Sequence, residues 1–311
     1  MSVISNSHLE QIDQFRQNLN STLIGKKQVV ENVLACVLAQ GHLLFDDLPG
    51  LGKTTLAKAI AQSIGGVFSR VQCTPDLLPS DITGFSLLNQ KTREFEFRKG
   101  PVFSNLLLAD EINRATPRTQ SALFEAMAER QVTIDNTTFP LANNFFVIAT
   151  QNPVESHGAY PLPEAQLDRF TMKLRIGYPA ADDEVELLAA QIGPANNRVL
   201  LESALTVEQL VEIQNRVSSI EVVDKVRRYL VDLGRATREH PNMELGLSPR
   251  GLITWQKVAQ AIAFLDDRDF VTPEDIRQCA RPVLELRVPG DQEEQATVID
   301  DILNQVAVPM S

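Results

Sequence analysis

One stretch of twelve residues, FDDLPGLGKTTL at positions 45–56, constrains the fold more than any other part of the chain. It joins an apolar segment to a tight turn with two glycines, and then to residues that favour a helix. A strand, a glycine loop and a helix start in this order present backbone N–H groups to an anion at the positive end of the helix. The stretch therefore predicts an α/β fold with a phosphate-binding loop.

The second half of this loop supplies the groups that a nucleoside triphosphate requires. The two glycines let the backbone approach phosphate oxygens closely, and Lys53 reaches the β and γ groups. Thr54 supplies a hydroxyl for Mg²⁺. The residues predicted to bind ATP in this loop are Pro49, Gly50, Leu51, Gly52, Lys53, Thr54 and Thr55.

The loop departs from the full pattern at one position, because Asp47 stands where the first glycine is expected. This position lies at the exit of the strand, where the requirement is mostly conformational, and aspartate tolerates unusual backbone angles better than most residues. Its charge near a polyphosphate is a modest electrostatic cost that Lys53 and Mg²⁺ offset. Taken alone, the loop leaves open an accidental Gly-Lys-Thr in a strand–helix turn.

A second motif, LLLADE at residues 106–111, follows further along the chain. It is an apolar strand that ends in two carboxylates, which places an acid beside the metal at the carboxyl edge of a parallel sheet. Asp110 is predicted to hold Mg²⁺, directly or through water. Glu111 is predicted to orient or deprotonate an attacking water, so hydrolysis is expected rather than nucleotide storage. The alternative is a surface turn of acidic residues, against which the order of the two motifs argues.

The first 178 residues alternate short apolar runs with helix-like segments, which predicts a parallel sheet flanked by helices. Helices are expected over 54–64, ending at Gly65-Gly66, and from Thr116-Pro117 onward, where Thr116 caps and Pro117 fills the first turn. The candidate strands, each expected to be buried on both faces, are 42–45, 67–71, 106–109, 145–150 and 172–176.

Two stretches do not fit this alternation. Residues 83–100 predict a hairpin that interrupts the second helix, and residues 131–141 predict another hairpin with a turn at Asp135-Asn136. After Tyr178-Pro179 only helices are expected. Their starts are marked by a capping box at Thr206, by Ser248-Pro249 and by Thr272-Pro273. We therefore predict an αβα core over residues 1–178 and a small helical domain over residues 179–311.

The charge and composition exclude several classes of function. A formal net charge of −11 and a pI of about 4.9 argue against a general nucleic-acid binder. The three cysteines lie far apart, without zinc spacing or a disulfide framework, and the four histidines form no metal pattern. The apolar runs are too short to span a bilayer, and the N-terminus has no secretory signal. We expect a cytoplasmic protein.

A third strand, 145–150, leads into the sequence TQNP. Asn152 at its exit is placed to hydrogen-bond the γ-phosphate and the attacking water from a neighbouring strand end. Taken alone, an Asn-Pro pair is more often just a turn.

Five motifs in order closely resemble those of the MoxR-type AAA+ ATPases. They are DLPGLGKT, LLLADEINRATPRTQSALFEAM, VIATQNPVE, YPLPEAQLDRF and LSPRGLITW. The resemblance extends from Ile24-Gly25 to VTPEDIRQCARPVLELRV, essentially the whole chain. It implies an AAA+ P-loop core with a five-stranded parallel sheet, followed by a helical lid. The same group has an insert in its second helix and a hairpin before the sensor strand, matching the two unexplained hairpins.

The resemblance also implies roles for individual residues. Asn152 matches the first sensor, and Arg250 matches the second sensor on the lid. An arginine just after a Ser-Pro helix start opposes the helix dipole, and a bound phosphate would explain it. Arg169 in LDRF matches an arginine finger that reaches the nucleotide of the neighbouring subunit. The alternative for Arg169 is an ion pair with Asp168 or Glu164.

Other matched positions concern the adenine and the interfaces. Ile24 and Gly25 match the adenine-side segment, with Tyr178-Pro179 at the hinge adding a contact. Arg114 is a candidate for the subunit interface, and a plain loop salt bridge is the alternative. The chain has Leu286-Arg287 where such proteins often have histidine-arginine, which puts a lid-interface role for that position in doubt.

The resemblance implies a Mg²⁺-dependent ATPase that forms a homo-oligomeric ring, for which six subunits is the family expectation. Its predicted task is to remodel or mature protein clients, in a family associated with von Willebrand factor A-type domains. One alternative is a nucleotide-gated assembly scaffold with slow hydrolysis, favoured by Asp47. A metal-chelatase motor subunit and a nucleic-acid motor are further alternatives, and the acidic charge argues against the last.

Overall fold

The computed structural model describes residues 6–152, 159–190, 201–243 and 245–309. At its centre is a five-stranded sheet with strand order β2-β5-β8-β1-β9, in which every neighbouring pair is parallel. The fold expected from the sequence is therefore confirmed, with strand ends shifted by one or two residues. The strands are β1 (Leu43–Asp46), β2 (Phe68–Gln72), β5 (Leu106–Asp110), β8 (Phe146–Gln151) and β9 (Met172–Leu174).

Helices cover both faces of this sheet. Alternate residues of β1 point to opposite faces, so Leu43 and Phe45 join one hydrophobic cluster while Leu44 joins the other. The first cluster is formed with α1 (Asn6–Thr22), α2 (Lys27–Leu38) and α3 (Lys53–Ser63), and the second with α5 (Pro117–Glu129).

The edge strand β2 corrects one prediction. We expected all five strands to be buried on both faces, but Arg70 and Gln72 of β2 are exposed and only Val71 is buried. An edge strand has a neighbour on one side only, and its end here opens onto a cleft. The polar residues of β2 are therefore available for a site.

The predicted helix boundaries agree with the chemistry of the helix ends. At the end of α3, Gly65 has a φ of +57° and the N–H of Gly66 donates to the carbonyl of Ala61 at 2.9 Å, which is a Schellman ending. At the start of α5, the hydroxyl of Thr116 accepts from the N–H of Thr119.

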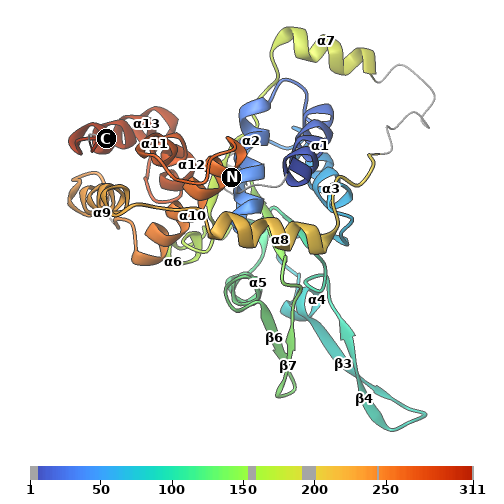
Figure 1. Cartoon of the computed structure of the whole chain (residues 1–311). Helices are drawn as coiled ribbons and strands as arrows, with labels where there is room; N and C mark the ends of the chain where they lie inside the picture. The colour runs from blue at the N-terminus through green and yellow to red at the C-terminus, as the bar shows by residue number, and fades with distance from the viewer. Residues whose placement is uncertain (1–5, 153–158, 191–200, 244, 310–311) are drawn as a thin grey trace.

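Both predicted hairpins are present and project from the same side of the molecule (Figure 1). The first consists of β3 (Gly84–Asn89) and β4 (Glu94–Lys99), and follows the short helix α4 (Pro79–Thr83). The second consists of β6 (Gln131–Ile134) and β7 (Thr137–Pro140), and its turn has positive φ at Asp135 and Asn136. Phe97 stacks on Phe139 with ring centroids 4.2 Å apart, so the bases of the two hairpins are in contact.

After β9 the described elements are helices, with one isolated β-bridge between Glu221 and Phe270. The hydroxyls of Thr206, Ser248 and Thr272 cap three of them, as expected. The helices described after β9 are α7 (Ala181–Ala190), α8 (Val207–Ser218), α9 (Asp224–Glu239), α10 (Pro249–Leu265), α11 (Pro273–Gln278), α12 (Ala280–Leu284) and α13 (Gln292–Gln305).

The C-terminal helices pack directly against the αβα core, mainly where α10 lies on α2 (Figure 1). One hydrophobic cluster runs from Phe15 and Val33 of the core to Trp255 and Ile299 of these helices. In contrast, α7 stands apart, with Val185 and Leu188 exposed. Among the described residues, each helix is too short or too polar to cross a bilayer.

Candidate functional site

A cleft of about 300 Å³ lies at the carboxyl edge of the sheet, where β1, β2, β5 and β8 end. We call it the sheet-edge cleft. It brings together these residues predicted from the sequence: Pro49, Gly50, Gly52, Lys53, Thr54, Thr55, Asp110, Glu111 and Asn152. Asp47, Arg70, Gln72, Thr150 and Gln151 also line it and were not among the predicted site residues.

The glycine loop has a shape that glycine residues make possible. Gly50 and Gly52 have φ values of +86° and +91°, which other residues adopt only with strain. A Cβ built on Gly50 would meet no atom within 4 Å, so the backbone faces open space there. Gly52 caps the N-terminus of α3. Backbone N–H groups at such a turn and helix start are available to an anion.

Lys53 is buried beneath the loop, and its ammonium donates to the carbonyls of Asp47 at 2.9 Å and Leu48 at 2.6 Å. Burial lowers the pKa of Lys53, while the nearby carboxylates of Asp110 and Glu111 oppose this change. Backbone carbonyls carry no formal charge, so they do not neutralise the ammonium, and its positive charge stays available to an anionic ligand. This arrangement suits the binding of a polyphosphate.

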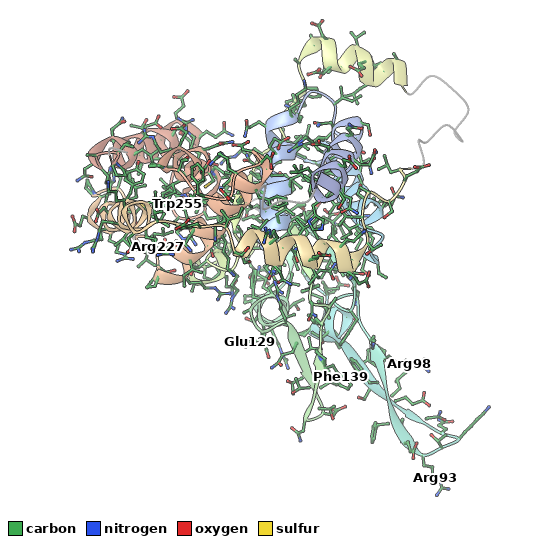
Figure 2. All side chains as sticks on the ribbon, viewed as in Figure 1. Arg93, Arg98, Glu129, Phe139, Arg227 and Trp255 are labelled. Carbon is green, nitrogen blue, oxygen red and sulfur yellow. The ribbon has the colours of Figure 1, made fainter. Side chains whose placement is uncertain are left out.

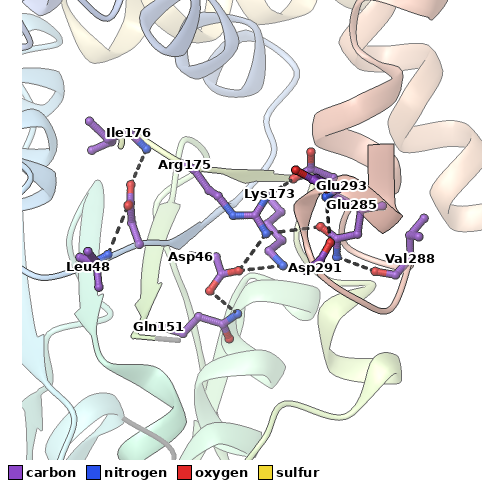
Figure 3. Close-up of polar contacts among 12 residues, drawn as sticks. Asp46, Leu48, Gln151, Lys173, Arg175, Ile176, Glu285, Val288, Asp291 and Glu293 are labelled. Atoms are coloured by element: carbon purple, nitrogen blue, oxygen red, sulfur yellow. Dashed lines mark hydrogen bonds and ion pairs between the residues drawn. The ribbon is translucent and has the colours of Figure 1, made fainter. Parts of the chain in front are cut away.

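Asp47, the departure from the loop pattern, has its carboxylate bound by backbone amides. One oxygen accepts from the N–H groups of Ile176 and of Gly177, the latter at 3.0 Å, and the other accepts from Leu48 at 3.2 Å. Figure 3 shows the contacts to the labelled residues Leu48 and Ile176. Three N–H groups compensate a single negative charge well. Asp47 therefore ties the start of the loop to the segment that leads from β9 to α7.

The two predicted acids lie side by side and share one partner on the neighbouring strand. The hydroxyl of Thr150 donates to Asp110 Oδ1 at 3.2 Å and accepts the N–H of Glu111 at 2.9 Å. Glu111 has a φ of +55°, a strained conformation for a non-glycine residue. Strain of this kind is typical of functional sites. Thr150 thus positions both acids. Its place in the TQN segment, at the end of a buried strand, was the available signal.

Arg114 forms an ion pair with Glu111, with Nη1 2.9 Å from Oε2. The loop salt bridge considered as the alternative for Arg114 is therefore present within the chain. Asn152 lines the cleft directly after β8, beside the two acids. Asn152 therefore lies at the strand end, as expected from the sequence, whereas Arg114 lies in the short helical turn after β5.

A network of partly buried charges connects the base of the loop to the C-terminal helices (Figure 3). Asp46 accepts from Gln151 at 3.2 Å and pairs with Lys173 at 2.9 Å. Arg175 pairs with Asp46 at 3.3 Å and with Glu285, next to α12, at 3.0 Å. Burial opposes the ionisation of Asp46, but Lys173 and Arg175 outweigh it and hold the pKa of this carboxyl below its usual value.

Arg169 lies at the other end of the sheet, since it precedes β9 and Thr171 donates to the carbonyl of His42 just before β1. Its Nη1 donates to the carbonyl of Phe124 at 3.3 Å, while its buried Nε has no partner among the described residues. The predicted alternative, an ion pair of Arg169 with Asp168 or Glu164, is absent from the described part of the chain.

Asp168 instead holds the C-terminal helices. It accepts from the hydroxyl of Ser248 at 3.0 Å and pairs with Arg287, whose Nε lies 3.1 Å away. The lid-interface role in doubt concerned position 286, where Leu286 is buried, and the contact with Asp168 is made by the neighbouring Arg287. Arg250 is exposed, two residues beyond Ser248, and does not line the sheet-edge cleft.

Three further predicted residues also lie outside the lining of the cleft. Leu51 packs against the hydrophobic cluster. Ile24 and Gly25 follow Leu23, whose side chain is 3.4 Å from a Cβ built on Gly52, so this segment adjoins the loop from behind. The carbonyl of the exposed Tyr178 accepts from Lys26 at 2.6 Å, which fastens the hinge to the same segment.

Known proteins resemble the chain over nearly its full length. A family model described as "ATPase family associated with various cellular activities (AAA)" matches residues 42–172, and one described as "AAA lid domain" matches residues 235–306. YeaC of Bacillus subtilis, described as uncharacterized, is 46% identical over 94% of this chain and 93% of its own.

Two further similarities are informative. The chaperone MoxR1 of Mycobacterium tuberculosis is 37% identical over 92% of this chain and 79% of its own. The crystal structure of a putative ATPase from Cytophaga hutchinsonii superposes with a TM-score of 0.88 at 37% identity, covering 97% of this chain and 96% of that one. The glycine loop and the paired acids lie within the region matched by the AAA model, and the C-terminal helices contain the region matched by the lid model. The chain therefore belongs to the MoxR-type AAA+ ATPases.

Proposed function

We propose that this chain hydrolyses Mg²⁺-bound ATP in the sheet-edge cleft, and that a neighbouring copy in a ring completes the catalytic site. The proposal depends on a separation of charged groups. Lys53, Asp110 and Glu111 meet in the cleft, whereas Arg169 lies at the opposite end of the same sheet. Membership of a family of ATPases supports the hydrolytic activity.

The residues of the cleft fit a metal-bound triphosphate. Gly50 leaves open space beside the backbone, and Lys53 offers an ammonium below it. Thr54 and Asp110 would hold Mg²⁺, since hydroxyl and carboxylate oxygens are the ligands that this ion prefers. When bound, Mg²⁺ supplies neutralisation of charge on the β- and γ-phosphates.

Hydrolysis then requires a base and a group that holds the water. Arg114 binds Oε2 of Glu111, so Oε1 is the atom that takes the proton from the attacking water. Asn152, at the end of the adjacent strand, hydrogen-bonds the γ-phosphate and orients this water. Thr150 hydrogen-bonds to both Asp110 and Glu111, and so holds the metal ligand and the base next to each other.

The location of the arginines supports the ring. Arg169 cannot reach the cleft of its own chain from the amino end of the sheet, and Arg250 lies near the same end, next to Ser248. A head-to-tail ring places this end of one copy against the cleft of the next. Arg169 then stabilises the charge that develops on the transferring phosphoryl group. Six copies is the family expectation.

The two hairpins are the part of the chain that we assign to protein clients. The first hairpin exposes Phe85, Leu87, Leu88 and Phe95, with Phe95 74% exposed. Arg93 lies at its tip and Arg98 along its side (Figure 2). Exposed apolar side chains in such a patch indicate a binding surface for polypeptide. This agrees with the chaperone name of the relative MoxR1. Proteins with von Willebrand factor A-type domains are the partners we expect.

The surroundings of Asp47 argue against the scaffold alternative. It depended on Asp47 weakening the affinity for ATP, but the carboxylate of Asp47 is bound by three amides. A steady-state ATPase assay separates the two proposals, since a scaffold would turn over slowly with and without client.

A mixing experiment tests the ring. The variants Glu111→Gln and Arg169→Ala should each be inactive alone, the first through its cleft and the second through its finger. In randomly mixed rings, a site is complete where an Arg169→Ala cleft meets the finger of a Glu111→Gln neighbour. This occurs at about a quarter of sites, so mixing should restore roughly a quarter of wild-type activity. If mixtures stay inactive while subunit exchange is seen, Arg169 does not act between subunits.

A further inference from the structure

Arg70 on the edge strand β2 forms an ion pair with Asp110, the residue that we assign to the metal. Its Nε lies 2.7 Å from Oδ2 of Asp110, and its Nη2 donates to the side-chain oxygen of Gln72 at 2.9 Å. The other oxygen of Asp110 accepts the hydroxyl of Thr150. Both oxygens of Asp110 are thus hydrogen-bonded within the chain. The motifs of the sequence did not single out Arg70.

This pairing competes with a metal ion. Mg²⁺ binds through lone pairs of carboxylate oxygens, and the Nε–H of Arg70, 2.7 Å from Oδ2, uses one of them. The positive guanidinium also repels a second cation placed beside the same carboxylate. The Asp110 side chain is only 10% exposed, so it has little freedom to offer another approach. In addition, the described residues contain no cluster of three or more His, Cys, Asp or Glu that could hold a metal. A metal here needs phosphate oxygens as further ligands.

Arg70 is also free to leave Asp110. Its side chain is 48% exposed and lines the same cleft as Lys53 and Gly50. An arginine on an edge strand is not confined by a neighbouring strand on its open side. The planar guanidinium donates two parallel hydrogen bonds to a phosphate as well as to a carboxylate. A triphosphate in the cleft therefore offers Arg70 a second anionic partner.

From this geometry we propose that Arg70 is an exchangeable counter-ion, a positioning residue that alternates between Asp110 and the nucleotide. In the empty cleft it holds the carboxylate of Asp110 and keeps divalent cations off it. With a metal-bound triphosphate in the cleft, Asp110 would be released to hold the metal, and Arg70 would pair with a phosphate instead. This inference rests on the proposed ATPase function, and it makes metal binding conditional on the nucleotide.

The test compares wild type with Arg70→Met, which keeps much of the side-chain length and removes the charge. Mn²⁺ is the probe, because its electron paramagnetic resonance signal distinguishes free from bound ion. Without nucleotide, Arg70→Met should bind Mn²⁺ about tenfold more tightly, since the competent fraction of Asp110 rises. With ATP, its KM should rise by about tenfold because one phosphate contact is lost. The control is Arg281→Met, which removes an exposed arginine paired with Asp300 and should change neither value.

Two results would overturn the inference. One is equal Mn²⁺ affinity of wild type and Arg70→Met without nucleotide, and the other is tighter Mn²⁺ binding with an unchanged KM. Arg70→Lys guards against misfolding of the first variant. It keeps the charge but cannot bind Asp110 and Gln72 together, and it should give an intermediate Mn²⁺ affinity. If wild type itself showed no hydrolysis, the proposed function would fail. The Mn²⁺ comparison without nucleotide would still test whether Arg70 keeps divalent cations off Asp110.

Discussion

The two ends of the central sheet differ in how fully their charged side chains are paired within the chain. At the carboxyl end, Asp47, Asp110 and Glu111 all have partners from the same chain, although they surround an open cleft. At the amino end, Arg169 keeps a buried Nε without a partner among the described residues. Leaving a buried donor unsatisfied costs about 1–3 kcal/mol. In the ring that we propose, this end of one copy lies against the cleft of the next.

The amino end also anchors the lid. Asp168, next to Arg169, binds Ser248 and Arg287 of the C-terminal part. A movement of the lid would therefore change the position of Arg169 directly. At the carboxyl end the corresponding link runs through Arg175 to Glu285. The lid is thus tied to both ends of the sheet, by Asp168 at the amino end and by Arg175 at the carboxyl end.

The largest effect is expected at the carboxyl end. Glu111→Gln removes the base but keeps a side chain that can still contact Arg114. We expect kcat to fall by about 10²–10⁴-fold while ATP stays bound, because general-base catalysis contributes this range. Steady-state turnover and filter binding of labelled ATP measure the two quantities. Glu129→Gln, at the exposed end of α5, is the control and should keep wild-type activity. An equal loss in both variants would show that Glu111 has no special role.

At the amino end of the sheet, we expect a substitution to change the stability of the fold. Asp168→Ala leaves Arg287 with its side chain only 8% exposed and without an anion. We expect the free energy of unfolding to fall by about 3–4 kcal/mol, as is typical when one partner of a buried pair is removed. Urea denaturation measures this change. The exposed pair of Arg281 and Asp300 provides the comparison, because Asp300→Ala should cost less than about 1 kcal/mol. Equal effects of the two variants would mean that Asp168 does not anchor the lid.

His42, buried at the amino end, predicts a pH dependence. It accepts the N–H of Val147 and donates to the carbonyl of Met127, so the fold requires its neutral form. Burial lowers the pKa of His42 to about 4, with smaller effects of Arg130 and Arg250 in the same direction. The unfolded chain therefore binds a proton between about pH 6.5 and 4 that the folded chain does not. Stability falls as the pH decreases through this window, by at most about 3 kcal/mol.

The measurement is the free energy of unfolding against pH for wild type and His42→Gln. Glutamine can both accept and donate but does not titrate in this window. The difference between the two curves should therefore shrink toward acid pH. Parallel curves would show that His42 does not contribute to the acid sensitivity.

The sequence predicted the sheet well, and local chemistry explains why. Strands such as 106–110 are short apolar runs, and the helix starts at Thr116, Ser248 and Thr272 have cap residues whose effect depends on the next three residues only. The burial of β2 was predicted wrongly because the position of a strand in the sheet depends on partners that are distant in sequence.

The same distinction applies to the site. Residues within motifs, such as Lys53 and Glu111, were found because their spacing along the chain is fixed by one loop or one strand end. Arg70 and Thr150 were missed because they meet Asp110 only after three strands have been placed side by side, forty residues from it in either direction. The contact of Arg287 with Asp168 spans an even longer separation.

The smallest effect is expected where the loop departs from its pattern. Asp47→Gly restores the usual residue but removes the acceptor for Ile176, Gly177 and Leu48. Each hydrogen bond to a charged group contributes about 1.5–3 kcal/mol. Because Asp47 lines the open cleft, water can replace much of the three lost bonds, and we expect a net loss of about 2 kcal/mol in the free energy of unfolding. Asp47→Asn keeps one oxygen acceptor and should lose about half as much.

The affinity for ATP separates this explanation from a purely electrostatic one. If the carboxylate of Asp47 serves the hinge amides, its removal should leave the Kd for ATP within about threefold of wild type, because those amides already compensate its charge. If instead it repelled the triphosphate, Asp47→Gly would bind ATP much more tightly than wild type, and Asp47→Asn would do so to a similar degree. Calorimetric titration of the three proteins decides between the two. A stability loss without tighter binding would mean that the aspartate belongs to the link between the loop and the hinge.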